Sequence, residues 1–193
     1  MKTTSKIKEI RDFLSVENIG EIALVPTMGF LHSGHLKLVE TAKKHGDTVV
    51  VSIFVNPLQF GPDEDFDKYP RNLKRDLDIL KESGADFVFH PEVAEMYPSD
   101  LELDISLNSM ADVLDGVKRP GHFEGVVTVV NKLFNIIKPH YVTFGEKDRQ
   151  QLMIVQKMIE DFNHDIEVLA VETEREDTGL AKSSRNTNLS EQE

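Results

Sequence analysis

The sequence predicts an α/β protein with a doubly wound parallel sheet in three layers, α/β/α. Short apolar, β-branched runs alternate along the chain with segments of helical periodicity, which is the pattern of βαβ units. The runs also lack polar alternation, so they suit strands that are covered on both faces. The 193 residues are enough for one sizeable domain with a buried core.

Each element follows from its local pattern. The first fourteen residues interleave charged and apolar side chains and predict an amphipathic helix. Apolar runs predict strands at 22–25, 48–55, 86–90, 140–145 and 166–171. The run 101–107 alternates with period two, which predicts a strand with one wet face. Apolar stripes predict four further helices, on Leu36, Val39 and Ala42; on Leu73, Leu77 and Leu80 before Gly84; on Val126, Val129, Val130, Leu133 and Ile137 before Pro139; and on Leu152, Val155, Ile159 and Phe162.

Composition excludes several classes of function. Twenty-two Lys and Arg against 34 Asp and Glu give a net charge of −12, which argues against a general nucleic-acid surface. Without cysteine the chain has no disulfide, no thiolate metal site and no cysteine nucleophile. The N-terminus lacks the continuous apolar core of a signal peptide, and the apolar runs are too short to span a bilayer. We therefore expect a soluble cytoplasmic protein without membrane partners.

A doubly wound sheet binds ligands beyond the carboxyl ends of its strands, so the loops there carry the candidate site. After the first strand, PTMGFLHSGH offers Gly29 and Gly34 for tight turns and Ser33 as a helix cap. This places His35 in the first helical turn, where with His32 it can donate hydrogen bonds to phosphate oxygens. One packed and one solvated histidine is the plainer alternative, and a metal site is less favoured because no third ligand stands nearby.

Two further loops are weaker signals. After the second strand, Asn56 and Gln59 can hydrogen-bond a small polar substrate, although a plain turn is the alternative for an isolated amide. The acidic run that follows, 63–68, predicts a solvated loop. In 118–125, Lys118, Arg119 and His122 precede a helix, and this segment suits a structural role as well as a functional one.

The last two loops favour an anionic ligand. After the fourth strand, Lys147 can serve as a point charge for phosphate, and Asp148 can hold a ribose hydroxyl or a metal. After the fifth strand, 179–186 places two serines between Lys182 and Arg185, the composition of a mobile phosphate clamp. Such cationic loops in an acidic protein together indicate a nucleotide site.

These blocks together resemble the pantothenate synthetase (pantoate–β-alanine ligase) family. The matching segments are PTMGFLHSGH, SIFVNPLQFGPDEDFDKYPR, RPGHFEGVVTVVNKLFNIIKP, FGEKDRQQL and TGLAKSSRN, in the family's order from about Ile22 to Leu189. H-x-G-H alone would indicate only the wider Rossmann-like superfamily of nucleotidyltransferases and class I aminoacyl-tRNA synthetases. Within that superfamily, AKSSR is similar to the mobile KMSKS-type loop.

The resemblance implies a two-step reaction. ATP and pantoate form pantoyl adenylate and pyrophosphate with the help of Mg²⁺, and β-alanine then displaces AMP to give pantothenate. It implies no particular protein ligand for the metal, and it implies a homodimer. Since a carboxylate is already a nucleophile, adenylation needs alignment and charge neutralisation more than a strong base.

The resemblance also assigns roles residue by residue. His32, His35, Lys147 and Arg185 would be catalytic, supplying donors and positive charge. Arg149 and Lys182 depart from the family's usual aromatic and aliphatic residues, so their side-chain roles are open. The ATP-binding residues would be Met28, Gly29, His32, Gly34, His35, Gly145, Glu146, Lys147, Asp148, Lys182, Ser183, Ser184 and Arg185, and those for pantoate and β-alanine Asn56, Gln59 and Gln151.

Two alternatives to the ligase remain. One is a nucleotidyltransferase of the same superfamily, which would leave NPLQF and GEKDRQQ unexplained. The other is a nucleotide- or pantoate-binding fragment with little turnover. We expect residues 1–189 to form the catalytic domain, with 190–193 as the start of a truncated C-terminal domain, because Ser190 and Glu193 have capping-box spacing. A longer chain should then make pantothenate faster than this one.

Overall fold

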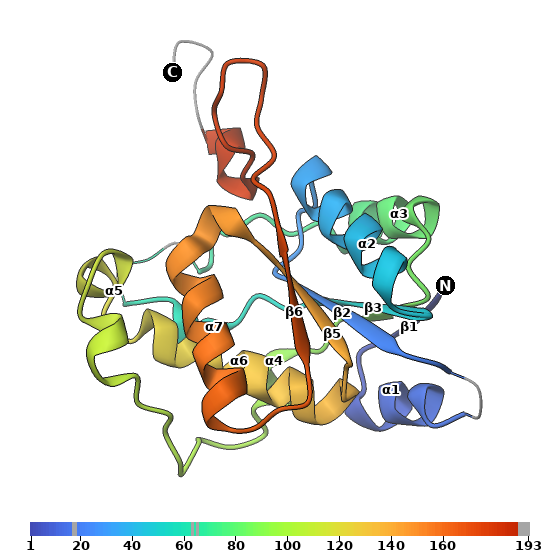
Figure 1. Ribbon diagram of the computed structural model, residues 1–193, viewed down its shortest axis with the longest axis horizontal. Coiled ribbons are helices and arrows are strands. Elements are labelled where there is room, and N and C mark those ends of the chain that lie inside the picture. Colours follow the sequence, from blue (N-terminus) through green and yellow to red (C-terminus); the bar gives the residue numbers. More distant parts are fainter. Residues whose placement is uncertain (17–18, 63, 65, 189–193) are drawn as a thin grey trace.

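The computed structural model describes residues 1–16, 19–62, 64 and 66–188 (Figure 1). The expected capping box of Ser190 and Glu193, and with it the proposed start of a further domain at 190–193, lies outside the described residues. Within the described residues, no helix is both long and apolar enough to cross a membrane.

The sheet is parallel throughout and is doubly wound, as predicted. Its six strands lie in the order β1-β4-β3-β2-β5-β6. From β2 the chain builds outward to β3 and β4 on one side, and then crosses to β5 and β6 on the other. The order therefore reverses between β2 and β5, where this class of fold forms its ligand crevice. The strand bounds are β1 Lys2–Thr4, β2 Ile22–Thr27, β3 Thr48–Ile53, β4 Phe87–Phe89, β5 Tyr141–Gly145 and β6 Glu167–Val171.

Helices cover both faces of the sheet, which confirms the three layers (Figure 1). One face carries α2 (Ser33–His45) and α3 (Leu73–Ser83), and the other carries α1 (Ile7–Leu14), α6 (His122–Ile137) and α7 (Arg149–Asp161). Short helices complete the chain: α4 Val93–Met96, α5 Asp115–Lys118, and the 3₁₀ turns η1 Pro57–Gln59, η2 Asn108–Ala111, η3 Glu146–Asp148 and η4 Ser184–Asn188.

The core is divided between the two faces by the alternation of strand side chains. In β2, Ile22 and Leu24 pack with the α6 side, whereas Ala23 and Val25 pack with the α2 and α3 side. All four are at most 5% exposed. Burial on both faces explains why this strand appears in the sequence as a continuous apolar run.

Three predictions about elements are wrong. The N-terminal segment is not one helix, because Lys2–Thr4 pairs with β4 through its backbone, and a polar three-residue strand has no apolar periodicity. Residues 101–107 form no strand: Ile105 and Leu107 pack against the core and Leu103 is 86% exposed, so the alternation reflects an irregular segment lying on the surface. Phe162 follows the last residue of α7 and is 55% exposed rather than part of the helix stripe.

Candidate active site

A tight turn connects β2 to α2 and brings the histidine motif over the end of the sheet. Gly29 and Phe30 both have positive φ, +83° and +51°, which reverses the chain within two residues. Asp76 of α3, 1% exposed, accepts hydrogen bonds from the backbone N–H groups of Phe30 (2.7 Å) and Leu31 (2.8 Å). A buried carboxylate on a neighbouring helix therefore fixes the turn that presents His32 and His35.

The helix cap that was expected from Ser33 is instead supplied by His32. Its Nδ1 accepts the N–H of Gly34 at 3.1 Å, and the Nδ1 of His35 accepts the N–H of His32 at 3.3 Å. A side chain on Gly34 would approach the His32 ring to 2.9 Å, so glycine allows that ring to fold back over the helix end. Ser33 lies within the first turn, and its buried hydroxyl has no hydrogen-bond partner among the described residues.

The same hydrogen bonds determine the protonation of both rings. Each Nδ1 accepts a backbone N–H, so in the neutral ring the proton lies on Nε2, which is free to donate. Burial lowers the pKa of His35 to about 3, aided by His32 and Lys147, and burial together with Lys147 and Lys182 lowers the pKa of His32. The histidines therefore supply hydrogen-bond donors, and the positive charge comes from the neighbouring lysine and arginine side chains.

Gln59 is held at the end of η1, directly on α6. A side chain on Gly125 would come within 2.2 Å of the Leu58 carbonyl oxygen, so only glycine permits this approach of η1 to the helix. Asn56, 1% exposed, donates to the Gly125 carbonyl oxygen (3.0 Å) and to Gln59 Oε1 (3.3 Å). Its Oδ1 accepts from Tyr97 Oη at 2.9 Å. Asn56 thus supports Gln59 from behind, with its amide engaged by protein groups.

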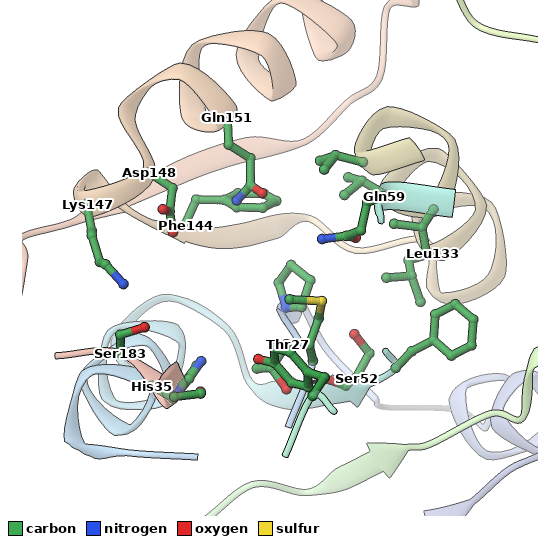
Figure 2. A pocket seen from close by; sticks show the side chains of 18 of the residues that line it. Thr27, His35, Ser52, Gln59, Leu133, Phe144, Lys147, Asp148, Gln151 and Ser183 are labelled. Carbon is green, nitrogen blue, oxygen red and sulfur yellow. Dashed lines mark hydrogen bonds between the residues drawn. The ribbon is translucent and has the colours of Figure 1, made fainter. Parts of the chain in front are cut away.

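A central cavity opens at the reversal between β2 and β5 (Figure 2). His35, Lys147 and Ser183 lie on one side of it, and Gln59 and Leu133 lie on the other. The predicted site residues that line this central cavity are Met28, His32, His35, Gln59, Lys147, Asp148, Gln151, Ser183, Ser184 and Arg185.

A side cavity adjoins it above the ends of β5 and β6. It adds Gly34, Gly145 and Lys182 of the predicted site, together with Val171–Glu174. Seven residues line both cavities and so stand between them: the apolar Pro26 and Phe144, and the polar His32, His35, Lys147, Asp148 and Gln151. A ligand in one cavity would therefore meet a ligand in the other at the two histidines.

Three residues of the predicted set, Asn56, Gly29 and Glu146, line neither cavity. Asn56 is buried behind Gln59, and Gly29 lines a neighbouring pocket beside Asp76. Glu146 is exposed and lies 3.8 Å from the exposed Arg149 guanidinium, so these two side chains pair with each other. Lys182 forms an ion pair with Glu176 at 3.6 Å, within the projecting loop that carries Ser183 and Ser184.

Comparison with known proteins identifies the family. The model of the pantoate-beta-alanine ligase family matches residues 2–193. The chain belongs to the pantoate-beta-alanine ligase family. It is similar to the pantothenate synthetase of Thermus thermophilus, at 48% identity and TM-score 0.95 over 100% of this chain and 69% of that one.

Two further solved structures extend the comparison. The pantoate-beta-alanine ligase of Francisella tularensis, in a complex described as holding beta-gamma ATP and β-alanine, is 40% identical with TM-score 0.95, covering 99% of this chain and 74% of that chain. A tyrosyl-tRNA synthetase from Archaeoglobus fulgidus is 15% identical with TM-score 0.54, covering 95% of this chain and 69% of that chain, which shows a shared fold alone.

Sequence reasoning missed several residues that line or support the central cavity. Val126, Val129, Val130 and Leu133 line the central cavity, although their helical stripe could not be told apart from ordinary core. Asp76 and His122 were missed as supports because the groups they hold are backbone atoms of distant segments. Gly125, in the first turn of α6, was the local signal of a close backbone approach.

The prediction of a solvated loop at 63–68 holds for Asp67 and Lys68, which are exposed, but is wrong for Glu64; residues 63 and 65 lie outside the described residues. Glu64 is not simply solvated, because Arg119 donates to both of its carboxylate oxygens at 2.6 Å. This hydrogen bond to Arg119 holds the pKa of Glu64 below its ordinary value. The loop after Gln59 is therefore tied to the segment that precedes α6.

Proposed function

We propose that this chain joins pantoate to β-alanine at the expense of ATP, through pantoyl adenylate, with release of pyrophosphate and AMP. The observation that carries the proposal is the pair of adjoining cavities that share His32 and His35. ATP occupies the side cavity with its phosphates toward the histidines, and pantoate occupies the central cavity. The carboxylate of pantoate then faces the α-phosphorus.

The central cavity suits pantoate chemically. Pantoate carries two methyl groups on one carbon, and Val129, Val130 and Leu133 offer an apolar surface for them. The amides of Gln59 and Gln151 can donate to its carboxylate and pair with its hydroxyl groups. Ser52 lines the same cavity, and its buried hydroxyl has no partner among the described residues, so it is available to a substrate hydroxyl.

The side cavity suits the nucleotide. Gly145 is open on this side, since an added side chain would meet nothing within 4 Å, so ATP can approach the backbone closely. Lys147 and Lys182 supply charge for the phosphates, and Ser183 and Arg185 meet them from the central cavity. The proposed ATP-binding residues also include Met28, Gly34 and Asp148, which line one or both cavities. Gly29 and Glu146 line neither cavity, and we assign them a supporting role in the loops that carry the others.

The first step needs no base from the protein. A carboxylate oxygen of pantoate forms a bond to the α-phosphorus, the bond from that phosphorus to the bridging oxygen breaks, and pyrophosphate leaves. Negative charge grows on the phosphate oxygens, where the Nε2–H groups of His32 and His35 donate and Lys147 and Arg185 neutralise. In the second step the amine of β-alanine attacks the acyl carbon, loses a proton, and AMP leaves.

A magnesium ion fits this arrangement as part of the nucleotide complex. Among the described residues there is no group of three or more His, Asp or Glu side chains that could hold a metal by itself. Mg²⁺ commonly takes one or two carboxylates and completes its shell with phosphates and water. Asp148, which lines both cavities, is the carboxylate we assign to it. When bound with ATP, the ion would neutralise phosphate charge.

The test is pyrophosphate release from ATP with and without pantoate and β-alanine. The ligase releases pyrophosphate only when pantoate is present, and it produces AMP and pantothenate in equal amounts when β-alanine is added. Transfer of a nucleotide to another acceptor without pantoate would show a nucleotidyltransferase. Binding of both ligands without pyrophosphate release would show a binding domain.

Three broader assignments belong to the same proposal. Residues 1–189 act as the ATP- and pantoate-binding catalytic unit, the enzyme works as a homodimer, and it resides in the cytoplasm. Light scattering coupled to size-exclusion chromatography tests the dimer directly, and a monomer mass at working concentration would reject it.

A further inference from the structure

The segment that carries Gln59 is held by a chain of hydrogen bonds from outside the cavity. His122, the first residue of α6, is 8% exposed, and its Nδ1 lies 2.8 Å from the Gln59 carbonyl oxygen. Its Nε2 lies 3.0 Å from Nη1 of Arg119. Arg119 also donates to the Gln59 carbonyl oxygen at 3.3 Å and to both oxygens of Glu64 at 2.6 Å.

Arg119 determines the direction of every bond in this chain. A guanidinium only donates hydrogen bonds, so Nε2 of His122 must accept, and the single ring proton then lies on Nδ1. Nδ1–H donates to the Gln59 carbonyl oxygen. Burial lowers the pKa of His122, opposed by this hydrogen bond and assisted by the Arg119 charge, so the neutral ring is the form present near neutral pH.

The carbonyl of Gln59 needs this support because of where it lies. η1 ends at Gln59, and Gln59 is 8% exposed while its side chain lines the central cavity. A buried carbonyl without a donor is costly, and a shift of the backbone to reach another donor would move the amide out of register with its ligand. Gly125 and Asn56 fix the same turn from α6 and from the strand side.

We propose that His122, Arg119 and Glu64 are positioning residues for the ligase reaction, which hold the backbone of Gln59 so that its amide is oriented toward pantoate. The inference rests on the proposed function, in which Gln59 binds pantoate. None of the three side chains needs to touch a substrate. Glu64 orients Arg119, Arg119 orients His122, and His122 holds the carbonyl with the shorter bond, assisted by Arg119.

The experiment measures KM for pantoate, KM for ATP and kcat from pantoate-dependent pyrophosphate release. Loss of the bond from His122 should raise KM for pantoate about tenfold in His122→Ala, the effect of one well-formed buried hydrogen bond, and leave KM for ATP within about twofold. His122→Asn should recover most of this loss, because its amide nitrogen can occupy the place of Nδ1. Thermal unfolding of each variant identifies any that fail to fold.

A double-mutant cycle separates positioning from general damage. In Gln59→Ala the amide is gone, so adding His122→Ala should raise KM for pantoate no further. His140→Ala is the matched control, since His140 accepts a backbone N–H from Ile22 at 3.0 Å at the opposite end of the sheet. It should leave both KM values unchanged.

Three results would overturn the inference. One is an unchanged KM for pantoate in a folded His122→Ala; another is an equal rise of both KM values without recovery in His122→Asn; the third is multiplied effects in the double variant. Gln59→Ala alone tests the proposed function. If that variant binds pantoate normally, Gln59 is not the pantoate ligand, and the positioning role fails with it.

Discussion

His35 illustrates how one residue can serve the fold and also, in the proposed mechanism, the reaction. Its Nδ1 accepts a backbone hydrogen bond at the start of α2, which leaves Nε2–H facing the cavity as a donor. The ring is kept neutral by burial, with His32 and Lys147 contributing. A neutral donor can strengthen its hydrogen bond as phosphate charge grows, without attracting ground-state ATP as strongly as a cation would.

The first prediction concerns the rate of adenylation. His35→Ala should lower the single-turnover rate of pantoyl adenylate formation about 100- to 1,000-fold, the range for loss of one transition-state donor, and change ATP binding little. Rapid-quench measurement of the adenylate with the bound ATP monitored separately provides the test. An unchanged single-turnover rate would reject the catalytic role.

The second prediction concerns stability against pH. The unfolded chain binds a proton at His35 near pH 6.5, and the folded chain binds it only near pH 3. Between these two pH values the unfolded chain binds one proton more than the folded chain. The free energy of unfolding therefore falls as the pH drops from about 6.5 toward 3, by at most about 1.4 kcal/mol per pH unit, and His35 causes no such loss above about pH 6.5. Urea unfolding of the protein and of His35→Asn between pH 4 and 8 should show a shallower acid loss in the variant. Parallel curves would contradict the assignment.

At the scale of elements, the site depends on how closely neighbouring segments can approach. η1 lies on α6 only because residue 125 has no side chain, and the 28–31 turn is held against α3 by Asp76, which accepts two of its N–H groups. Both arrangements are contacts between segments that are far apart in sequence. Each one connects a cavity-lining segment to a rigid helix.

The third prediction tests the contact of η1 with α6. Gly125→Ala should destabilise the protein by about 1–3 kcal/mol, because the new carbon would meet backbone atoms that cannot move aside, and it should weaken pantoate binding. Gly145→Ala is the matched control for stability: its added carbon meets nothing, so the free energy of unfolding should stay within about 0.5 kcal/mol. Equal effects of the two substitutions in chemical denaturation would contradict this account.

The fourth prediction tests the support of the histidine turn. Asp76→Asn replaces a carboxylate that accepts two N–H groups by an amide that can accept only one without turning its own N–H groups toward the other. We expect a loss of about 1–3 kcal/mol in stability and a slower adenylation rate. Asp78→Asn, on the exposed face of the same helix, should change neither. A fully active Asp76→Asn variant would show that the 28–31 turn keeps its conformation without the Asp76 carboxylate.

At the scale of the whole molecule, the sheet separates two hydrophobic cores, of which one supports the histidine motif and the other borders the central cavity. The core under α2 and α3 supports the histidine motif from behind, and the core under α6 and α7 continues directly into the central cavity. Leu80 is fully buried in the first core, and Leu133, 3% exposed, belongs to the second and lines the cavity.

The fifth prediction follows from that separation. Leu80→Ala and Leu133→Ala should each reduce stability by about 2–5 kcal/mol, the usual range for such truncations in a core. At a temperature where both variants are folded, only Leu133→Ala should raise KM for pantoate, since only that side chain borders the cavity. Calorimetric unfolding and steady-state kinetics give the two values. A raised KM in Leu80→Ala would show that the two cores are not independent.

The sequence by itself determined five of the six strands, the main helices and the loops that border the two cavities. Continuous apolar runs at 22–25, 48–55 and 140–145 required burial on both faces, and that requirement is local enough to predict a parallel sheet. The motif blocks indicated the ligase family because their residues and spacing are specific in themselves. The sequence did not predict the short strand at Lys2–Thr4, because this strand is defined by backbone pairing with β4, a segment far away in the sequence.

Only the tertiary structure decided which polar groups face the cavity and which are hydrogen-bonded within the protein. Asn56 and Gln59 are both amides in the loop after one strand, so the sequence does not distinguish them. In the structure the Asn56 side chain is hydrogen-bonded to Gly125 and Tyr97, whereas Gln59 lines the cavity. The pKa of His35 and the role of His122 were likewise hidden, because both depend on burial and on partners from other segments. Hydrogen-bond partners far apart in sequence leave no periodic pattern, so only the folded chain reveals them.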